Sequence, residues 1–389
     1  MRRLMMPAAL TLPLALLLSS CTQTGGGSRD SAKADGRTIT VESSDDACTL
    51  SATSGPSGSL TFEVSNTGSD VTEFYLYADG GDRIVSEVEN IGPGLERELV
   101  VAIKPGDYIA ACKPGMRGDG IRVDFEVTDS GETVSAPDDT ALIEQAEEGY
   151  EQYVESESAA LVAATEEFVT AYTAGQDDRA RTLYPQARTH WERIETVAES
   201  FADLDPLLDA READLEPGQR WTGWHRLEKD LWPERAEDYR TLTSRQRQVL
   251  ADHLLTKTDE LDGRIRDLDI TVDQITNGSR GLMEEVATGK ITGEEEYWSR
   301  TDLWDFQANV DGAKAAFELL APVVAGRDAE LEESLDERFD ALQELLDKHR
   351  VGDGFRPYDD LTQAEIKSLA DAVNALSEPL SELTAVVAS

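Results

Sequence analysis

The stretch 221-WTGWHRLEKDLW-232 combines apolar and ionisable residues with the period of a helix. At about 100° per residue, Leu227 falls on the same side as Trp224. His225 and Glu228 lie together on the flank of that apolar stripe, and residues three apart are neighbours on a helix surface. The stretch therefore predicts a helix that buries one face and points two metal-ligating side chains at one place.

A related pentapeptide, 191-WERIE-195, precedes 224-WHRLE-228 in the chain, and Glu192 aligns with His225. If the first segment is also helical, Glu192 and Glu195 border its buried stripe and share one turn. Side by side, the two helices can bring three carboxylates and one imidazole together, a donor set that suits iron or zinc. Such pairs also arise by chance, so a purely structural role for both helices is the alternative.

Other acidic positions near these helices can complete a metal site. In a later helical run, Glu285 borders the apolar stripe, whereas Glu284 points away from it. The connecting loop offers Asp203, Asp205, Asp209 and Asp214. The remaining histidines fit the pattern less well and are expected in core or surface roles; they are His190, His253 and His349.

The charge of the chain excludes one class of partner. Lys and Arg number 36 and Asp and Glu number 78, which gives a net charge of −42. Such a surface repels phosphate backbones, so nucleic-acid binding is not expected. Most of these carboxylates are expected to form an ordinary solvated surface.

The N-terminus reads as a lipoprotein signal peptide over residues 1–20. Two arginines precede the apolar run 4-LMMPAALTLPLALLL-18, which is short for a membrane span. The following 18-LSSC-21 resembles a bacterial lipobox, in which Cys21 becomes the lipidated first residue. The alternative is a plain secretory signal with an incidental cysteine. We therefore expect a protein outside the cytoplasm, in the cell envelope or periplasm, tethered to the membrane by lipid.

Composition divides the rest of the chain into a tether and two folded domains. Residues 21–36 are small and polar, as in a flexible tether. Residues 37–129 contain short β-prone runs separated by turn signals, which predict an all-β sandwich. A linker at 130–142 leads to residues 143–389, whose period predicts an all-α, mostly antiparallel bundle. The expected strands are 38–42, 59–66, 72–78, 98–103, 107–112 and 121–128, and the expected helical runs are 143–174, 178–203, 219–232, 243–288, 302–324, 329–348 and 362–386.

Two cysteines besides Cys21 lie in the predicted sandwich, at Cys48 and Cys112. In an oxidising compartment the default for such a pair is a disulfide. Their use as thiolate metal ligands is the alternative. An ordinary type 1 copper site would need two histidines, and no histidine precedes residue 190.

Three strings make the chain similar to a known family: 190-HWERIETVAESFADLDPLLDAREAD-214, 223-GWHRLE-228 and 291-ITGEEEYWSRTDLWDFQANVDGA-313. They resemble the EfeO family of extracytoplasmic iron-uptake proteins, and the resemblance runs from the lipobox to the C-terminus. It implies a cupredoxin-like sandwich followed by an imelysin-like helical domain, in agreement with the change in composition near residue 140.

The resemblance also implies which residues bind metal. It implies His225 and Glu228 as ligands, with Glu192 and Glu195 as carboxylate partners. Asp209 from the connecting loop and Glu285 from the later helix are further carry-overs. In the sandwich it implies a second site, for a metal such as copper or zinc, at Cys48, Glu73 and Cys112, with Glu87 or Glu89 nearby.

The function implied is capture of iron, ferrous or ferric, and its delivery to a membrane permease. The implied partners are an iron permease of the EfeU type and a haem peroxidase of the EfeB type, and no enzymatic activity is expected. The rival hypothesis is a zinc metallopeptidase, because a His-x-x-Glu pair also opens the metal site of some carboxypeptidases. Against it, the sequence lacks the His-Glu-x-x-His signature of helix-borne zinc peptidase sites.

Overall fold

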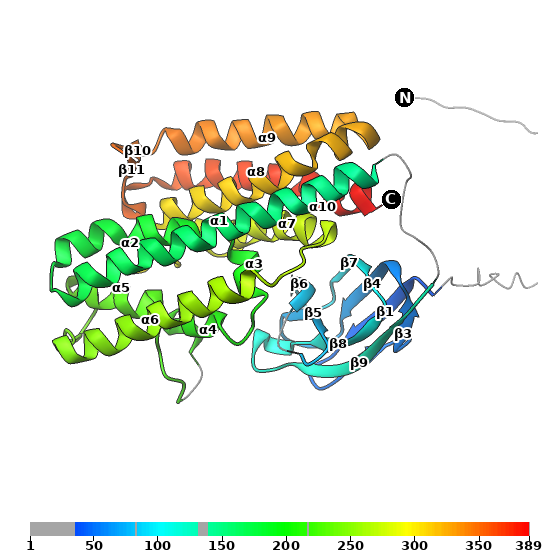
Figure 1. Cartoon of the computed structure of the whole chain (residues 1–389), viewed down its shortest axis with the longest axis horizontal. Coiled ribbons are helices and arrows are strands. Elements are labelled where there is room, and N and C mark those ends of the chain that lie inside the picture. Colours follow the sequence, from blue (N-terminus) through cyan, green and yellow to red (C-terminus); the bar gives the residue numbers. More distant parts are fainter. Residues whose placement is uncertain (1–35, 82–83, 131–138, 216–217, 389) are drawn as a thin grey trace, which may run out of the picture. The chain divides into compact units, whose positions relative to one another are not determined.

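Strands occupy the chain from Thr38 to Thr128, and helices occupy most of it from Thr140 to Ala388 (Figure 1). The computed structural model describes residues 36–81, 84–130, 139–215 and 218–388. The predicted signal peptide, Cys21 and the tether lie outside the described residues, apart from Gly36. Residues 36–389 form one compact unit.

The strands form the predicted two-sheet sandwich. One sheet has the order β2-β1-β4-β7 and the other the order β3-β9-β8-β5-β6. Most neighbours are antiparallel, but β1 pairs with β4 and β3 with β9 in parallel. The bounds are β1 Thr38–Ser43, β2 Cys48–Leu50, β3 Ser54–Pro56, β4 Gly58–Asn66, β5 Thr72–Ala78, β6 Ile84–Ile91, β7 Glu96–Ile103, β8 Gly106–Cys112 and β9 Ile121–Thr128.

The sandwich buries the apolar residues that alternate along its strands. Phe62 on β4 packs against Phe74 on β5 and Phe125 on β9, with ring centroids 5.3 Å apart in both pairs. Because β4 belongs to one sheet and β5 and β9 to the other, these rings join the two sheets. A disulfide between Cys48 and Cys112 makes a covalent link across the same core.

The helical part contains the predicted amphipathic runs, two of them divided. The run expected over 178–203 is interrupted at Arg193 and Ile194, and the run over 243–288 is interrupted at 266–271. The bounds of the α-helices are α1 Thr140–Thr173, α2 Asp177–Glu192, α3 Glu195–Glu199, α4 Asp205–Leu208, α5 Trp224–Leu231, α6 Ser244–Ile265, α7 Val272–Thr288, α8 Asp302–Arg327, α9 Ala329–Asp347 and α10 Gln363–Ala388. A short 3-10 turn, η4 (Lys290–Thr292), follows α7.

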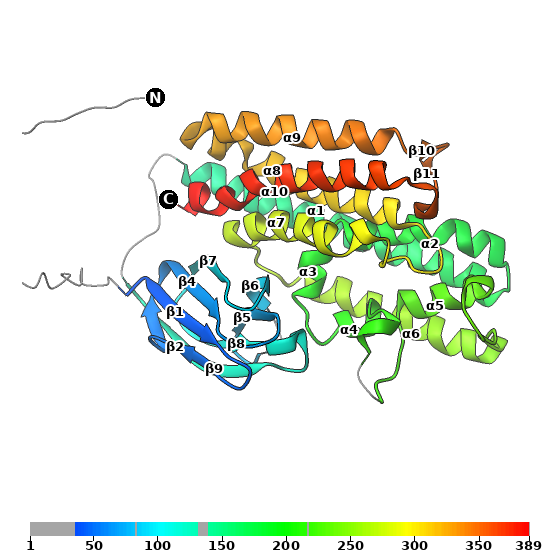
Figure 2. The ribbon, with the colours of Figure 1, turned by 180° about the vertical axis from the view of Figure 1, so that it is seen from behind.

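Helix α1 packs against α2, α6 and α8, and α10 lies between α9 and α7 (Figure 2). The shared core contains large aromatic side chains, including Trp191 and Trp224, both fully buried. The tryptophans of the two related pentapeptides therefore hold their segments in one core. Within the described ranges, the helices are all too short or too polar to cross a membrane.

Candidate metal centre

His225 stands in the first turn of α5, two residues after a glycine that lets the chain approach α4. Gly223 has a φ of +84°, and a Cβ there would lie 2.1 Å from the carbonyl oxygen of Leu208. Only a residue without a side chain fits this contact. Leu208 precedes Asp209, so the close approach brings the histidine next to the aspartate of the connecting loop.

The imidazole of His225 is fully buried and surrounded by carboxylates. Its Nε2 lies 3.2 Å from Oε1 of Glu295 and 3.4 Å from Oδ1 of Asp209. Its Nδ1 lies 3.3 Å from Oε2 of Glu228 and 3.9 Å from Oε1 of Glu296. We call these five residues the His225 half of the centre.

Glu228 divides its two oxygens between the imidazole and a loop. Oε2 faces His225, while Oε1 accepts hydrogen bonds from the backbone N–H groups of Trp298 and Ser299, at 2.7 and 2.6 Å. These bonds fix the carboxylate, because two donors hold one oxygen in place. Glu228 is therefore positioned by the segment between η4 and α8 as well as by its own helix.

That segment also supplies Glu295 and Glu296, and a second close approach fixes its start. Gly293 has a φ of +75°, and a Cβ there would lie 2.4 Å from the ring of Tyr358. Beyond it, Glu294 is exposed whereas the next two glutamates are buried. Glu296 also accepts hydrogen bonds from the hydroxyls of Tyr184 (3.1 Å) and Ser299 (2.6 Å).

A fully buried arginine on α2 lies among the same carboxylates. Arg188 forms ion pairs with five acidic side chains and thereby joins the loop, the segment before α8 and α8 itself. Its partners are Glu192, Asp209, Glu295 (3.4 Å), Glu296 (2.7 Å) and Asp305 (3.3 Å). The attraction between a buried guanidinium and several carboxylates offsets much of the cost of removing these charges from water, and it fixes their relative positions.

Glu192 and Glu195 are brought together although they belong to different helices. Lys290 Nζ lies 2.7 Å from both oxygens of Glu195 and 3.0 Å from Oε2 of Glu192. Asn309 on α8 donates to the same carboxylates, at 3.1 Å for Glu192 and 2.9 Å for Glu195. With Asp209, the two glutamates form a group whose ligand atoms lie within 4.8 Å of one another.

We call Glu192, Glu195 and Asp209 the Glu195 half of the centre. Asp209 belongs to both halves, since it also groups with His225 and Glu295. Among the described residues, no hydrogen bond or ion pair joins His225 directly to Glu192 or Glu195. The expected convergence on the imidazole is thus seen as a direct contact only for Glu228, while Glu192 and Glu195 bind Arg188 and Lys290 instead.

The acidic surroundings change the protonation of His225. Burial disfavours the charged imidazolium, but the Asp209 carboxylate and the hydrogen bonds to Glu228 and Glu295 outweigh burial and raise the pKa of His225 to about 10. Burial alone would also raise the pKa of Glu295; Lys290 and His225 hold it well below its usual value. At neutral pH the pair is therefore an imidazolium and a carboxylate.

In the Glu195 half, burial has the largest effect on the pKa of Glu192 and of Glu195. Burial and mutual repulsion raise the pKa of Glu192 to about 8, and burial raises that of Glu195 to about 7 even though Lys290 opposes it. For Lys290 burial favours the neutral amine, but Glu192 and Glu195 outweigh it and hold its pKa well above the usual value. Lys290 is thus a buried ammonium ion.

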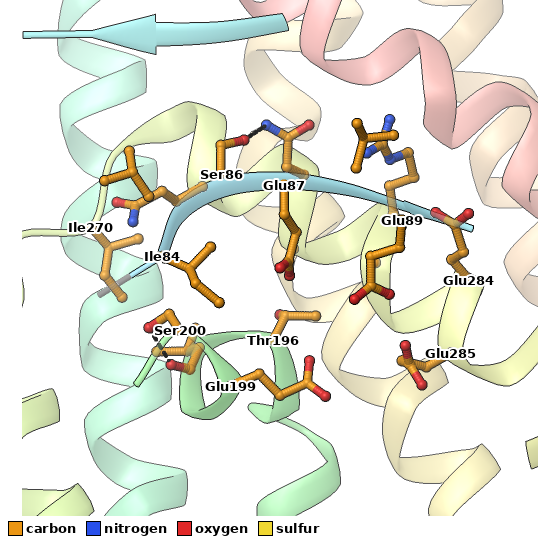
Figure 3. A pocket seen from close by; sticks show the side chains of 18 of the residues that line it. Ile84, Ser86, Glu87, Glu89, Thr196, Glu199, Ser200, Ile270, Glu284 and Glu285 are labelled. Atoms are coloured by element: carbon orange, nitrogen blue, oxygen red, sulfur yellow. Dashed lines mark hydrogen bonds between the residues drawn. The ribbon is translucent and has the colours of Figure 1, made fainter. Parts of the chain in front are cut away.

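Glu285 does not join either half. It lines a different pocket, in which Glu87 and Glu89 of β6 face Glu199 of α3 and Glu285 of α7 (Figure 3). Burial raises the pKa of Glu285 to about 7. Glu284 lines the same pocket, so the predicted contrast between the two residues is not seen, and the space that Glu285 faces is not the one beside His225.

The sulfur atoms proposed for a second metal site are bonded to each other. Because Cys48 and Cys112 form a disulfide, neither offers a thiolate, and the site expected at Cys48, Glu73 and Cys112 is wrong for this oxidation state. Glu73 is buried and accepts a hydrogen bond from Tyr75 at 2.8 Å, and Tyr75 also contacts Glu89 at 3.1 Å.

Only one of the four histidines joins the acidic cluster. His190 pairs with Glu157 at 2.6 Å, and His349 contacts Arg356 at 2.7 Å. His253 lies on α6 and is part of no metal-ligating group in the described chain. The His₂Glu set of a zinc peptidase is therefore not assembled.

Four residues of the centre were not identified from the sequence: Arg188, Lys290, Glu295 and Glu296. The acidic run 294-EEE-296 follows a glycine and is not part of a helical pattern, so no helical period indicates which of its three glutamates point inward. Buried arginines and lysines are rare, and nothing in a single sequence distinguishes them from surface cations.

Comparison with known proteins agrees with this architecture. The imelysin family model, a family also named as a peptidase, matches residues 146–383, and a cupredoxin-like domain model matches residues 8–122. The first match covers the helices that carry the centre, and the second covers most of the sandwich.

Named relatives resemble the chain over most of its length. An Efem/EfeO family lipoprotein of Staphylococcus haemolyticus is 40% identical over 72% of this chain and 94% of its own. The iron uptake system component EfeO of Yersinia pestis is 36% identical over 91% of this chain and 92% of its own. The same component of Escherichia coli O157:H7 is 35% identical over 97% of both chains. The chain, with its cupredoxin-like and imelysin domains, therefore belongs to the EfeO family of iron uptake system components.

Proposed function

We propose that the protein captures iron outside the cytoplasm at the His225 half and delivers it to a membrane permease. The observation that supports this most directly is one fully buried imidazole with carboxylate oxygens of Glu295, Glu228 and Asp209 at 3.2–3.4 Å. These distances are those of hydrogen bonds, so an ion would enter by displacing the proton of His225 and drawing the oxygens around itself.

The donor set supports iron as the cargo. Carboxylate oxygens suit iron and manganese, and a single imidazole adds a directional ligand that favours iron or zinc. The charge of three carboxylates compensates an ion of charge two or three in a buried site. The names of two relatives as iron uptake components support iron among these candidates.

The remaining predicted residues act beside the ion in this proposal. Glu192 and Glu195 group with Asp209, which belongs to both halves, and bind Arg188 and Lys290 beside the ion. Glu296 accepts a hydrogen bond from the hydroxyl of Tyr184 and so orients the segment that carries Glu295. Glu285 is left out of the ligand set because it faces the pocket of Figure 3.

Delivery requires the carrier to stay close to the membrane. A lipid on Cys21 and the tether after it would hold the two domains within reach of a permease of the EfeU type and a haem peroxidase of the EfeB type. Tethering raises the effective concentration of one partner at the other without any new contact. The disulfide and the lipoprotein name of one relative support a location outside the cytoplasm.

Isothermal titration of the mature chain with ferrous iron under anaerobic conditions, and with a ferric chelate, tests the proposal. The variant His225→Ala/Glu228→Ala should lose binding, whereas His253→Ala should retain it. Unchanged binding in a folded double variant would reject the site. Loss of binding in both variants would point to damage of the bundle, which circular dichroism detects.

The peptidase hypothesis needs a separate test because the imelysin family carries a peptidase name. Zinc-loaded protein is incubated with a mixed peptide substrate, and products are analysed by mass spectrometry. We expect no cleavage. Cleavage by the native protein that is lost in Glu228→Gln would support the peptidase hypothesis against iron capture.

A further inference from the structure

The ammonium group of Lys290 is bound by two of the three carboxylates of the Glu195 half. Lys290 is 1% exposed, and Nζ contacts three carboxylate oxygens within 3.0 Å. It comes from η4, whereas the carboxylates come from α2 and α3. Three oxygens from two helices around one cation resemble a coordination site more than a surface ion pair.

We propose that Lys290 is a built-in cation that closes the Glu195 half to metal, so that the helical domain binds one ion and not two. The inference rests on the proposed function for the first ion only. It assigns to Lys290 the role of setting the stoichiometry of the centre.

The geometry of the Glu195 half supports this assignment. Glu192, Glu195 and Asp209 can place one oxygen each within 4.8 Å of one another, as ligands of one ion do. Both oxygens of Glu195 and one of Glu192 are already bound to the ammonium. A metal ion would have to displace a buried cation from the same atoms, against the repulsion of like charges at short range.

In the His225 half, cations leave one side open. Arg188 pairs with Asp209, Glu295 and Glu296, and Arg211 also pairs with Glu295. Among the described residues, no lysine or arginine forms an ion pair with Glu228, whose Oε2 faces the imidazole. A guanidinium is fixed by its planar geometry and cannot be deprotonated in proteins. Arg188 therefore binds carboxylates of both halves, and the imidazole with Glu228 is the part of the centre that it leaves for the cargo.

Replacing Lys290 by methionine tests the proposal, because methionine keeps an unbranched side chain, one atom shorter, and removes the charge. The probe is Mn²⁺ alone, which prefers carboxylate oxygen and does not oxidise readily. Bound ions are counted by the loss of the free-ion electron paramagnetic resonance signal. We expect one ion per chain in the native protein and two in Lys290→Met.

Three matched variants separate the possible causes. Lys314→Met removes a half-buried lysine of α8 that lies outside the centre, and it should keep one ion. Lys290→Met/Glu195→Gln removes the cation and one of its carboxylates, and should return the count to one. Lys290→Met/His225→Ala/Glu228→Ala should bind only the new ion. This variant therefore tests the second ion independently of the first, and failure of the proposed function can be distinguished from failure of this inference.

Two results would overturn the proposal. The first is a folded Lys290→Met protein that still binds one ion. The second needs no variant: an anomalous Mn²⁺ peak between Glu192 and Glu195 in crystals of the native protein would show that Lys290 yields to metal. If Lys290→Met is less stable than the native protein without metal, the thermal unfolding of both proteins is measured with and without Mn²⁺. A rise larger than that of the native protein supports the new site, and an equal rise contradicts it.

Discussion

Nε2 of His225 lies 3.2 Å from Oε1 of Glu295, although 70 residues separate the two in the chain. The contact joins α5 to the segment before α8, and both residues are buried. It identifies Glu295 as a ligand candidate that the His-x-x-Glu spacing alone does not reveal.

Glu295→Gln is expected to weaken iron binding by about 100-fold, since it removes a charged ligand next to the imidazole. Glu294→Gln is the matched control, because Glu294 is the adjacent residue and its carboxylate is exposed. Both affinities are measured by anaerobic titration. Equal affinities in the two variants would exclude Glu295 from the ligand set.

Iron binding is expected to release a proton from His225. The imidazole must be neutral to bind metal, and its pKa in the metal-free protein is raised to about 10. Below that pH the ion competes with the proton, so affinity should rise about tenfold per pH unit between about 6 and 9. Titrations in two buffers of different ionisation enthalpy count the protons released. A count near zero at neutral pH contradicts the assignment.

Metal-free protein is expected to lose stability as the pH rises from about 5 to about 8. Burial raises the pKa of Glu192 to about 8 and that of Glu195 and Asp302 to about 7. In this window the folded chain keeps protons that the unfolded chain has lost, so the free energy of unfolding falls as pH increases. Urea unfolding at several pH values checks this. A free energy that increases over the window would contradict the protonation assigned to these groups.

Cys48→Ala/Cys112→Ala is expected to destabilise the sandwich without affecting iron capture. The bonded cysteines are 64 residues apart, and a cross-link over such a loop contributes about 4 kcal/mol through the entropy of the unfolded chain. Urea unfolding measures the loss, and titration with iron measures binding. A reduced number of bound ions in this variant would restore a metal role for the cysteines.

The sequence predicted both domains because their periods differ over long segments. Alternating residues in runs such as 121–128 indicate strands, and apolar stripes such as that of 143–174 indicate helices. The break at Arg193 and Ile194 was not predicted, because the stripe of Trp191, Ile194 and Ala198 is continuous in sequence. Strand β6 was missed too, since Glu87 and Glu89 interrupt its apolar pattern.

The pair on one helix was predicted from its spacing, whereas the residues that reach the centre from turns were not. His225 and Glu228 share α5, so spacing alone places them together. Glu295 and Lys290 reach the centre through turns, whose direction depends on tertiary contacts such as that of Gly293 with Tyr358. No periodicity records those contacts.

Glu228 joins α5 to the segment before α8 through its carboxylate group. One of its oxygens faces the imidazole and the other holds two backbone N–H groups of the segment before α8. Helix α5 and that segment cannot part while both hydrogen bonds persist. If the proposed function holds, the carboxylate that binds the ion is therefore also the one that joins α5 to this segment, and any movement between the two changes a ligand of the ion.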